Sequence, residues 1–196
     1  FLFFTMINQS TRIAIQSNGR LKNDSVAFLQ SLGIKFPTST GRSLLIAADN
    51  APIEVVFVRH RDIPRYVQSG VVQYGIVGEN VLYEYDTNVR QLQRLEFGNC
   101  NLVIAAPLDS GIKTVADLSG LRIATAYPNS LKKFLRQYNI TATIVQVDGS
   151  VEVTPQLDLA DAICDLTQTG TTLQAHQLVP VQTILESSAV LITTPL

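Results

Sequence analysis

Two aspartates and a threonine-rich segment near the C-terminal end of the chain are the residues best suited to chemistry. Residues 160–173 read Ala-Asp-Ala-Ile-Cys-Asp-Leu-Thr-Gln-Thr-Gly-Thr-Thr-Leu, a pattern typical of a strand, a hydroxyl-rich turn and a helix. Because alternate side chains of a strand share one face, Asp161 and Asp165 are expected to point the same way. The turn comprises Thr167, Gln168, Thr169, Gly170, Thr171 and Thr172.

This turn has the composition of a phosphate site. Backbone N–H groups at a helix start, beside hydroxyl groups and a flexible glycine, suit a phosphate monoester. A carboxylate on the adjoining strand suits a sugar diol, because it accepts hydrogen bonds from two hydroxyls. A phosphate site beside a diol site would suit a ribose 5-phosphate as the ligand. A helix start capped by a threonine has the same pattern, so the spacing alone leaves both interpretations open.

The composition of the 196 residues excludes several other functions. Lys and Arg total 15 and Asp and Glu total 16, a net charge of −1, without the basic surplus typical of nucleic-acid-binding proteins. The chain is 46% hydrophobic and 16% charged, which is typical of a globular protein, and no apolar run approaches the ~20 residues of a membrane helix. We therefore expect a cytoplasmic protein that binds neither nucleic acid nor a membrane.

The cysteines and histidines do not have the spacing of a metal site or a disulfide framework. The chain contains two of each, Cys100, Cys164, His60 and His176. Cys164 lies within an apolar run and is expected to be a small core residue. Both histidines are expected at the surface.

Alternating strand-like and helix-like segments predict the α/β class. Residues 53–58 are typical of a strand, and a helix is expected after Asp62, with Pro64 in its first turn. Residues 75–78 close the next strand. Strand–helix units repeated in this way predict mixed or parallel sheets with helices on both faces.

Two pairs of segments resemble each other in the same order. Residues 12–14 and 122–124 both read Arg-Ile-Ala, and each is followed by a polar turn, Leu-Lys and a helical segment. Residues 72–78 and 160–166 form the second pair. They predict two similar lobes with a ligand-binding cleft between them, at the carboxyl ends of the strands.

The predicted boundaries follow from this repeat. Lobe I is expected at 11–97 plus 181–196, and lobe II, which carries the threonine-rich turn, at 98–180. Residues 1–10 are expected to be a disordered N-terminal extension, with the only methionine, Met6, inside it.

Five segments together are similar to the ATP phosphoribosyltransferase family, whose members catalyse the first step of histidine biosynthesis. They lie at 16–21, 62–64, 75–80, 149–152 and 161–173. Most of the resemblance lies in one succession of motifs, Gly-Ser-Val-Glu followed by Ala-Asp-Ala-Ile-Cys-Asp and Thr-Gly-Thr. The resemblance as a whole extends from about Thr11 to the end of the chain.

The resemblance implies a glycosyltransferase of the pentosyltransferase type, with a bilobal fold like that of periplasmic binding proteins. The phosphoribosyl group of 5-phosphoribosyl 1-pyrophosphate would pass to N1 of ATP, with release of pyrophosphate. By the same resemblance, the turn at 167–172 would hold the 5-phosphate, and Asp165 the ribose hydroxyls, with Asp161 and Glu152 close by. Arg20 and Arg59 would face anionic groups across the cleft, and Asn80 would lie near the nucleotide.

This chemistry needs no covalent catalyst. Displacement of pyrophosphate passes through an oxocarbenium-like state, which nearby carboxylates stabilise; the candidates are Asp165, Asp161 and Glu152. Pyrophosphate leaves readily once magnesium and arginine neutralise it. Mg²⁺ is therefore expected as the cofactor, carried by the substrate rather than by protein ligands.

The chain departs from the family pattern at several positions. Ser17 and Asn18 occupy a turn where a lysine is usual, Gln73 replaces an acidic residue, and Asn101 lies where a basic residue is common. A lost lysine beside polyphosphates removes a contact worth about 1.5–3 kcal/mol. This favours an alternative hypothesis, a non-catalytic solute- or nucleotide-binding bilobal module or a weakened regulatory paralogue.

The resemblance also implies partners. A homo-oligomer, dimer or higher, is expected. The chain is expected to be either a truncated long form, without an ACT-like regulatory domain, or a short form that needs a histidyl-tRNA-synthetase-like regulatory subunit; its motifs favour truncation.

Overall fold

The computed structural model describes residues 10–37 and 43–195 of the chain. Of the predicted extension, only Ser10 falls within the described residues. The chain divides into two units. Unit 1 contains residues up to Leu82, Asp86–Gly98 and the residues from Ser188 onward, and unit 2 contains Tyr83–Tyr85 and Asn99–Ser187.

Unit 1 is built on a mixed six-stranded sheet in the order β2-β3-β1-β4-β11-β5. Strands β3, β1 and β4 are parallel, whereas β2, β11 and β5 are added antiparallel. The strands are β1 (Thr11–Gln16), β2 (Leu45–Ala47), β3 (Ile53–Val58), β4 (Tyr74–Gly78), β5 (Arg90–Arg94) and β11 (Ala189–Thr193). The helices are α1 (Lys22–Ser31), α2 (Ile63–Gln68) and α3 (Glu79–Tyr85), whose last turn belongs to unit 2.

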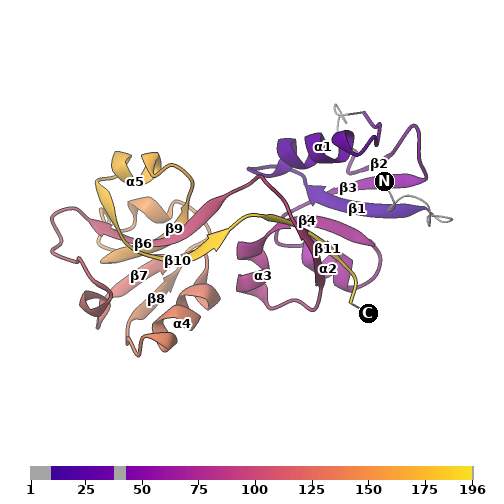
Figure 1. Cartoon of the computed structure of the whole chain (residues 1–196). Helices are drawn as coiled ribbons and strands as arrows, with labels where there is room; N and C mark the ends of the chain where they lie inside the picture. Colours follow the sequence, from indigo (N-terminus) through magenta and orange to yellow (C-terminus); the bar gives the residue numbers. More distant parts are fainter. Residues whose placement is uncertain (1–9, 38–42, 196) are drawn as a thin grey trace. The chain divides into compact units, whose positions relative to one another are not determined.

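Both faces of this sheet are covered, which explains the apolar runs of its central strands. Ile13 and Ile15 pack with Leu29 of α1 in one core. On the other side α2 lies so close to β4 that a Cβ added at Gly75 would come within 2.7 Å of Ile63. Figure 1 shows α1 and α2 on opposite sides of the sheet.

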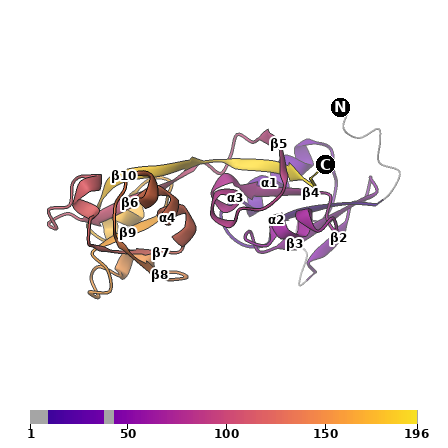
Figure 2. The same cartoon turned by 90° about the horizontal axis from the view of Figure 1, so that it is seen from below.

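Unit 2 has a mixed five-stranded sheet in the order β10-β6-β9-β7-β8. Strand β7 is parallel to β8 and β9, and β6 is antiparallel to β9 and β10. The strands are β6 (Cys100–Pro107), β7 (Arg122–Thr125), β8 (Thr143–Gln146), β9 (Ala162–Thr167) and β10 (Leu178–Ser187). The helices are α4 (Pro128–Gln137), α5 (Thr171–Ala175) and the short 3₁₀ turns η2 (Val115–Leu118) and η3 (Val151–Val153). Figure 2 shows β10 and β8 at the two edges of this sheet.

Successive residues of β9 supply two separate cores. Cys164 packs on one face with Leu131 and Phe134 of α4, and Ile163 packs on the other with Leu173 of α5. Burial raises the pKa of the Cys164 thiol well above its ordinary range. The prediction that Cys164 is a core residue is therefore confirmed.

The two sheets share one arrangement, as the sequence repeat predicted. The parallel strands β3-β1-β4 of unit 1 correspond to β8-β7-β9 of unit 2, and each trio is flanked by an antiparallel strand, β11 or β6. The predicted α/β class with two similar lobes and mixed sheets is confirmed.

The unit boundaries differ in detail from the predicted ones. Unit 2 begins at Asn99, and the chain returns to unit 1 at Ser188 rather than at residue 181. The reason is β10, which runs to Ser187 and pairs with β6 along its length.

Among the described residues, no helix combines the length and the apolar character needed to cross a membrane.

Candidate functional site

The threonine-rich turn connects β9 to α5 at the carboxyl end of the strand. The N–H of Gly170 donates to Thr167 Oγ1 at 3.0 Å, and the hydroxyls of Thr169 and Thr171 lie 3.1 Å apart. Gly170 has a φ of 78°, a left-handed conformation that favours glycine. These contacts curl the turn back on itself.

The turn exposes most of its polar groups. The side chains of Gln168, Thr169, Thr171 and Thr172 are exposed. The first N–H groups of a helix have no acceptor within the helix, and in α5 the N–H of Gln174 bonds back to Gly170 at 3.1 Å. Backbone N–H groups of the helix start and threonine hydroxyls thus meet at one place, as a phosphate site requires.

Asp165 lies on β9 just before this turn, with Glu152 nearby. Burial raises the pKa of Asp165 to about 6, although the Leu166 N–H lowers it by donating to Oδ1 at 2.8 Å. The negative charge of Glu152, on η3, raises it further. Glu152 is therefore near enough to Asp165 for its charge to act on that carboxyl, and Asp165 immediately precedes the turn.

Asp161 does not join this group. It precedes β9, and its carboxylate accepts hydrogen bonds from the backbone N–H, Nε and Nη2 of Arg122 at 2.8, 3.2 and 2.9 Å. These bonds hold the pKa of Asp161 below its ordinary value. Asp161 and Asp165 are four residue steps apart along extended backbone, a distance of about 13 Å, although the two share a face. The interpretation of Asp161 as a partner of Asp165 at one site is therefore corrected: Asp161 anchors Arg122.

The predicted unit 1 residues follow the carboxyl ends of three parallel strands. Arg20 comes after β1, Arg59 after β3 and Asn80 after β4. A Cβ added at Gly78 would lie 2.2 Å from Asn80 Oδ1 and 3.8 Å from Arg20 Nη2, so Arg20 and Asn80 converge at this glycine. Arg20 also donates to the Gly98 carbonyl. Arg59 is exposed in the neighbouring turn, and Asn80 is buried.

Two of the departures from the family pattern occupy different surroundings. Gln73 accepts the Arg12 N–H at 2.9 Å and donates to the Gly70 carbonyl at 3.2 Å, at the amino end of β4 and away from the strand ends that carry Arg20 and Asn80. Asn101 on β6 is paired in register with Thr167. A residue at position 101 therefore borders the threonine-rich turn, whereas Gln73 supports the sheet.

Sequence reasoning missed two features. His60 was expected at the surface, but it is half-buried; burial lowers its pKa, and the charges of Arg61 and Arg20 lower it further. Glu84, at 2% exposure, accepts hydrogen bonds at the start of α4. The sequence does contain a signal that Glu84 is buried. Glu84 follows the buried Val81 by three positions, so the two side chains lie on the same face of the helix.

The described ranges, 10–37 and 43–195, contain no group of three or more His, Cys, Asp or Glu side chains placed to hold a metal ion. In unit 2, Asp165 and Glu152 provide a pair of carboxylates.

The two mixed sheets with their helices place the chain in a class of α/β folds that also includes periplasmic solute-binding proteins. The aliphatic sulphonate binding protein SsuA from Escherichia coli matches with a TM-score of 0.63 and 15% identity, over 96% of this chain and 66% of that chain. At this identity the likeness shows the fold alone.

Within this class, the family model for HisG, ATP phosphoribosyltransferase, matches residues 59–196. The chain belongs to the ATP phosphoribosyltransferase family. An ATP phosphoribosyltransferase of Maricaulis maris is 46% identical over 188 residues, which cover 92% of this chain and 63% of the relative. The chain thus spans less than two thirds of the length of that relative.

A solved structure agrees with this assignment. The ATP phosphoribosyl transferase (HisG:HisZ) complex from Thermotoga maritima matches with a TM-score of 0.81 and 29% identity, over 94% of this chain and 88% of that chain.

Proposed function

We propose that the protein transfers the phosphoribosyl group of 5-phosphoribosyl 1-pyrophosphate to N1 of ATP and releases pyrophosphate, as the first step of histidine biosynthesis. Family membership supports this reaction. The observation that carries it in the structure is the exposed 167–172 turn beside Asp165. The reaction belongs to amino-acid biosynthesis, and we propose a cytoplasmic location.

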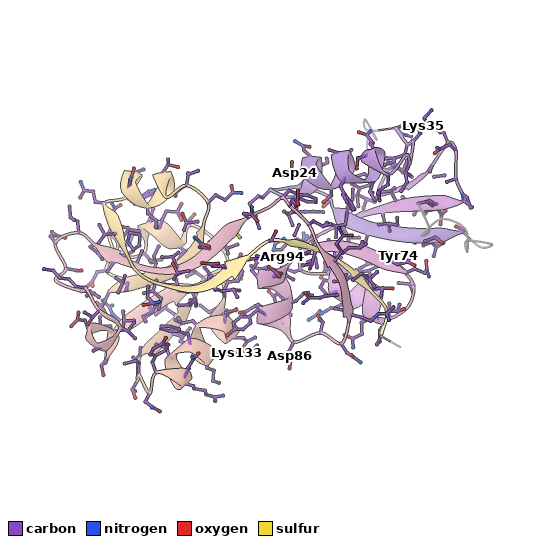
Figure 3. All side chains as sticks on the ribbon, viewed as in Figure 1. Asp24, Lys35, Tyr74, Asp86, Arg94 and Lys133 are labelled. Carbon is purple, nitrogen blue, oxygen red and sulfur yellow. The ribbon has the colours of Figure 1, made fainter. Side chains whose placement is uncertain are left out.

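The donor's 5-phosphate is assigned to unit 2 rather than to the corresponding turn of unit 1. There β4 passes directly into α3, and the Glu79 N–H donates to the Ser188 carbonyl at 2.9 Å. Glu79 Oε2 accepts the Ser188 N–H at 2.8 Å and pairs with Arg94, labelled in Figure 3, at 3.3 Å. The start of α3 is therefore occupied by its own chain, whereas the turn of unit 2 exposes Gln168, Thr169, Thr171 and Thr172.

Asp165 and Glu152 are assigned to the ribose. An ionised Asp165 accepts hydrogen bonds from ribose hydroxyls, and its charge stabilises the positive charge that develops on the sugar as pyrophosphate departs. Its partly buried position strengthens this interaction, because fewer water molecules screen it. No covalent intermediate with the protein is required.

Arg20 and Arg59 are proposed to bind anionic groups of the substrates, and Asn80 to lie near the nucleotide. The convergence of Arg20 and Asn80 at Gly78 supports a shared site for these two residues. Arginine suits such a site because it is always charged and donates in a planar fork to phosphate oxygens.

The chemistry of the donor set fits Mg²⁺ as an ion carried by the substrate. Mg²⁺ usually keeps several water molecules and binds substrate phosphates, and the described residues contain no group of three or more His, Cys, Asp or Glu side chains that could enclose it. Bound magnesium would neutralise the charge that develops on pyrophosphate. Asp165 and Glu152 would hold the hydroxyls that orient the ribose.

We further propose a homo-oligomer and a HisZ-like regulatory partner. The Thermotoga maritima relative is an ATP phosphoribosyl transferase in a HisG:HisZ complex, which supports a partner of this kind.

The test measures pyrophosphate release from ATP and the phosphoribosyl donor, with and without Mg²⁺. Asp165→Asn should lower kcat/KM by about 100-fold or more, because it removes a charge that stabilises the transition state. Asp158→Asn is the matched control, since Asp158 is an exposed aspartate of unit 2 whose carboxylate pairs with Arg122. Donor binding without pyrophosphate release would instead support a non-catalytic module.

A further inference from the structure

One asparagine of the chain is followed directly by a glycine. Asn18 and Gly19 lie in the turn between β1 and α1, and every other asparagine of the sequence precedes a residue with a side chain. Glycine has no Cβ, so its peptide nitrogen is open to approach. This pair is therefore the place where an asparagine amide of this chain reacts most readily with its own backbone.

The turn exposes both residues and fixes the chain on either side of them. The Ser17 N–H donates to the Val58 carbonyl at 2.8 Å, and the Lys22 N–H donates to the Gly19 carbonyl at 3.2 Å. Between these two bonds, Asn18 and Gly19 are both exposed. Water and base thus have access to the atoms that would react.

The exposed side chain of Asn18 contrasts with an asparagine that is held in place. Asn50 donates from Nδ2 to the Gly33 carbonyl at 2.7 Å, and its Oδ1 accepts the Lys35 N–H at 2.9 Å. To turn toward its own backbone, the Asn50 amide must lose both hydrogen bonds. The exposed Asn18 amide is free to rotate toward the nitrogen of Gly19.

The backbone makes glycine necessary after Asn18. Gly19 has a φ of 115°, and a Cβ added there would lie 2.4 Å from Gln16 Nε2. The side chain of Gln16 is fixed in turn, because its Oε1 accepts the Leu21 N–H at 2.9 Å just before α1. The turn therefore keeps an unshielded peptide nitrogen beside the Asn18 amide.

We propose that Asn18 is a deamidation site, at which conversion to aspartate or isoaspartate places a negative charge in the turn that carries Arg20. The nitrogen of Gly19 loses its proton to base and forms a bond to Asn18 Cγ. The bond from Cγ to the amide nitrogen breaks, and this nitrogen takes up a proton and leaves as ammonia. Water then opens the succinimide at either carbonyl, so the net change is amide plus water to carboxylic acid plus ammonia.

The new charge acts on the binding of anions. A carboxylate two residues before Arg20 repels phosphate groups that approach this arginine. Isoaspartate also inserts one more carbon into the main chain of the turn, which shifts Arg20 relative to β1. This effect on activity rests on the proposed function, whereas the conversion of Asn18 does not.

The conversion is tested by prolonged incubation of the full chain at pH 8 in water labelled with heavy oxygen, followed by peptide mass spectrometry. Asn139 is the matched control, an exposed asparagine in the turn after α4 that precedes the β-branched Ile140. Asn18 should exchange its amide for solvent oxygen at least about tenfold faster than Asn139, because Gly19 leaves the peptide nitrogen unshielded. The rate should fall at pH 6, where less of that nitrogen is deprotonated. Equal rates at the two asparagines would overturn the inference.

Two substitutions separate the modification from its effect. Asn18→Asp should raise the KM for at least one of the two phosphorylated substrates by about tenfold. Asn18→Gln, which closes a larger ring and does so more slowly, should keep the wild-type KM and resist conversion. A wild-type KM in Asn18→Asp would overturn the effect on anion binding. Conversion of Asn18 in a chain that releases no pyrophosphate would contradict the proposed function and leave the deamidation site standing.

Discussion

The carboxylate of Glu84 accepts hydrogen bonds from both the backbone N–H and the hydroxyl of Ser130, each at 2.7 Å. Its other oxygen accepts the Asn129 N–H at 3.0 Å. The first turn of α4 thus receives its cap from another helix, α3, and the negative charge lies at the positive end of the helix dipole. Lys133 of α4, labelled in Figure 3, completes the contact by donating to the Tyr83 carbonyl at 2.6 Å.

Glu84→Ala should therefore destabilise the protein by about 3 kcal/mol, because it leaves buried donors at the start of α4 without an acceptor. Urea unfolding followed by circular dichroism measures the loss. The exposed Glu186→Ala should change the free energy of unfolding by less than about 0.5 kcal/mol. Equal changes in the free energy of unfolding for the two substitutions would show that the cap formed by Glu84 does not stabilise the protein.

The ionisation of Asp165 predicts a pH-dependent activity. Its pKa of about 6 means that the carboxylate loses its charge as the pH falls from 7 to 5. Turnover should fall over this range with a midpoint near pH 6, and Asp158→Asn should keep the same profile. A wild-type rate that is independent of pH between 5 and 7 would remove Asp165 from the site.

The same shift predicts a stability effect of opposite sign. A carboxyl whose pKa is raised on folding costs stability when it is ionised, so this cost is absent below about pH 4 and complete above pH 6. Asp165→Asn should consequently raise the free energy of unfolding by about 2 kcal/mol at pH 8 and have little effect at pH 4. Denaturant titrations at the two pH values provide the measurement.

Asp161 should behave in the reverse way. Its pKa is lowered by Arg122, so its contribution to stability is present above the ordinary carboxyl pKa and is lost as the pH falls through the lowered value. Asp161→Asn should cost about 1 kcal/mol at pH 7, since the pair is partly exposed, and should leave the KM for the phosphoribosyl donor unchanged. A large rise in that KM would return Asp161 to the substrate site.

Gly170 offers a test of the phosphate turn. Gly170→Ala and Gly111→Ala both place a side chain at a φ near 78°, with open space around the added Cβ. Each should destabilise the protein by about 1 kcal/mol. Only Gly170→Ala should raise the KM for the donor, because it alone distorts the turn between Thr167 and Thr171. Identical donor kinetics in the two variants would argue against phosphate binding there.

Much of the candidate site could be predicted because its parts are close together in the sequence. Asp165 and the 167–172 turn occur within eight residues, so strand alternation and turn chemistry were enough to associate them. The same alternation led to the inference that Asp161 belongs to one site with Asp165. A shared strand face specifies the direction in which side chains point but not their distance along the strand.

The sequence by itself determined the α/β class, the repeated strand–helix unit and the hydroxyl-rich turn, because side-chain periodicity and turn-forming residues act over a few neighbouring positions. Only the tertiary structure decided which charged groups are available for binding. It pairs Asp161 with Arg122, 39 positions away, and Glu84 with Ser130, 46 positions away, and it places Arg20 near His60. The physical reason is that hydrogen-bonding and electrostatic partners meet only after distant strands and helices have packed together.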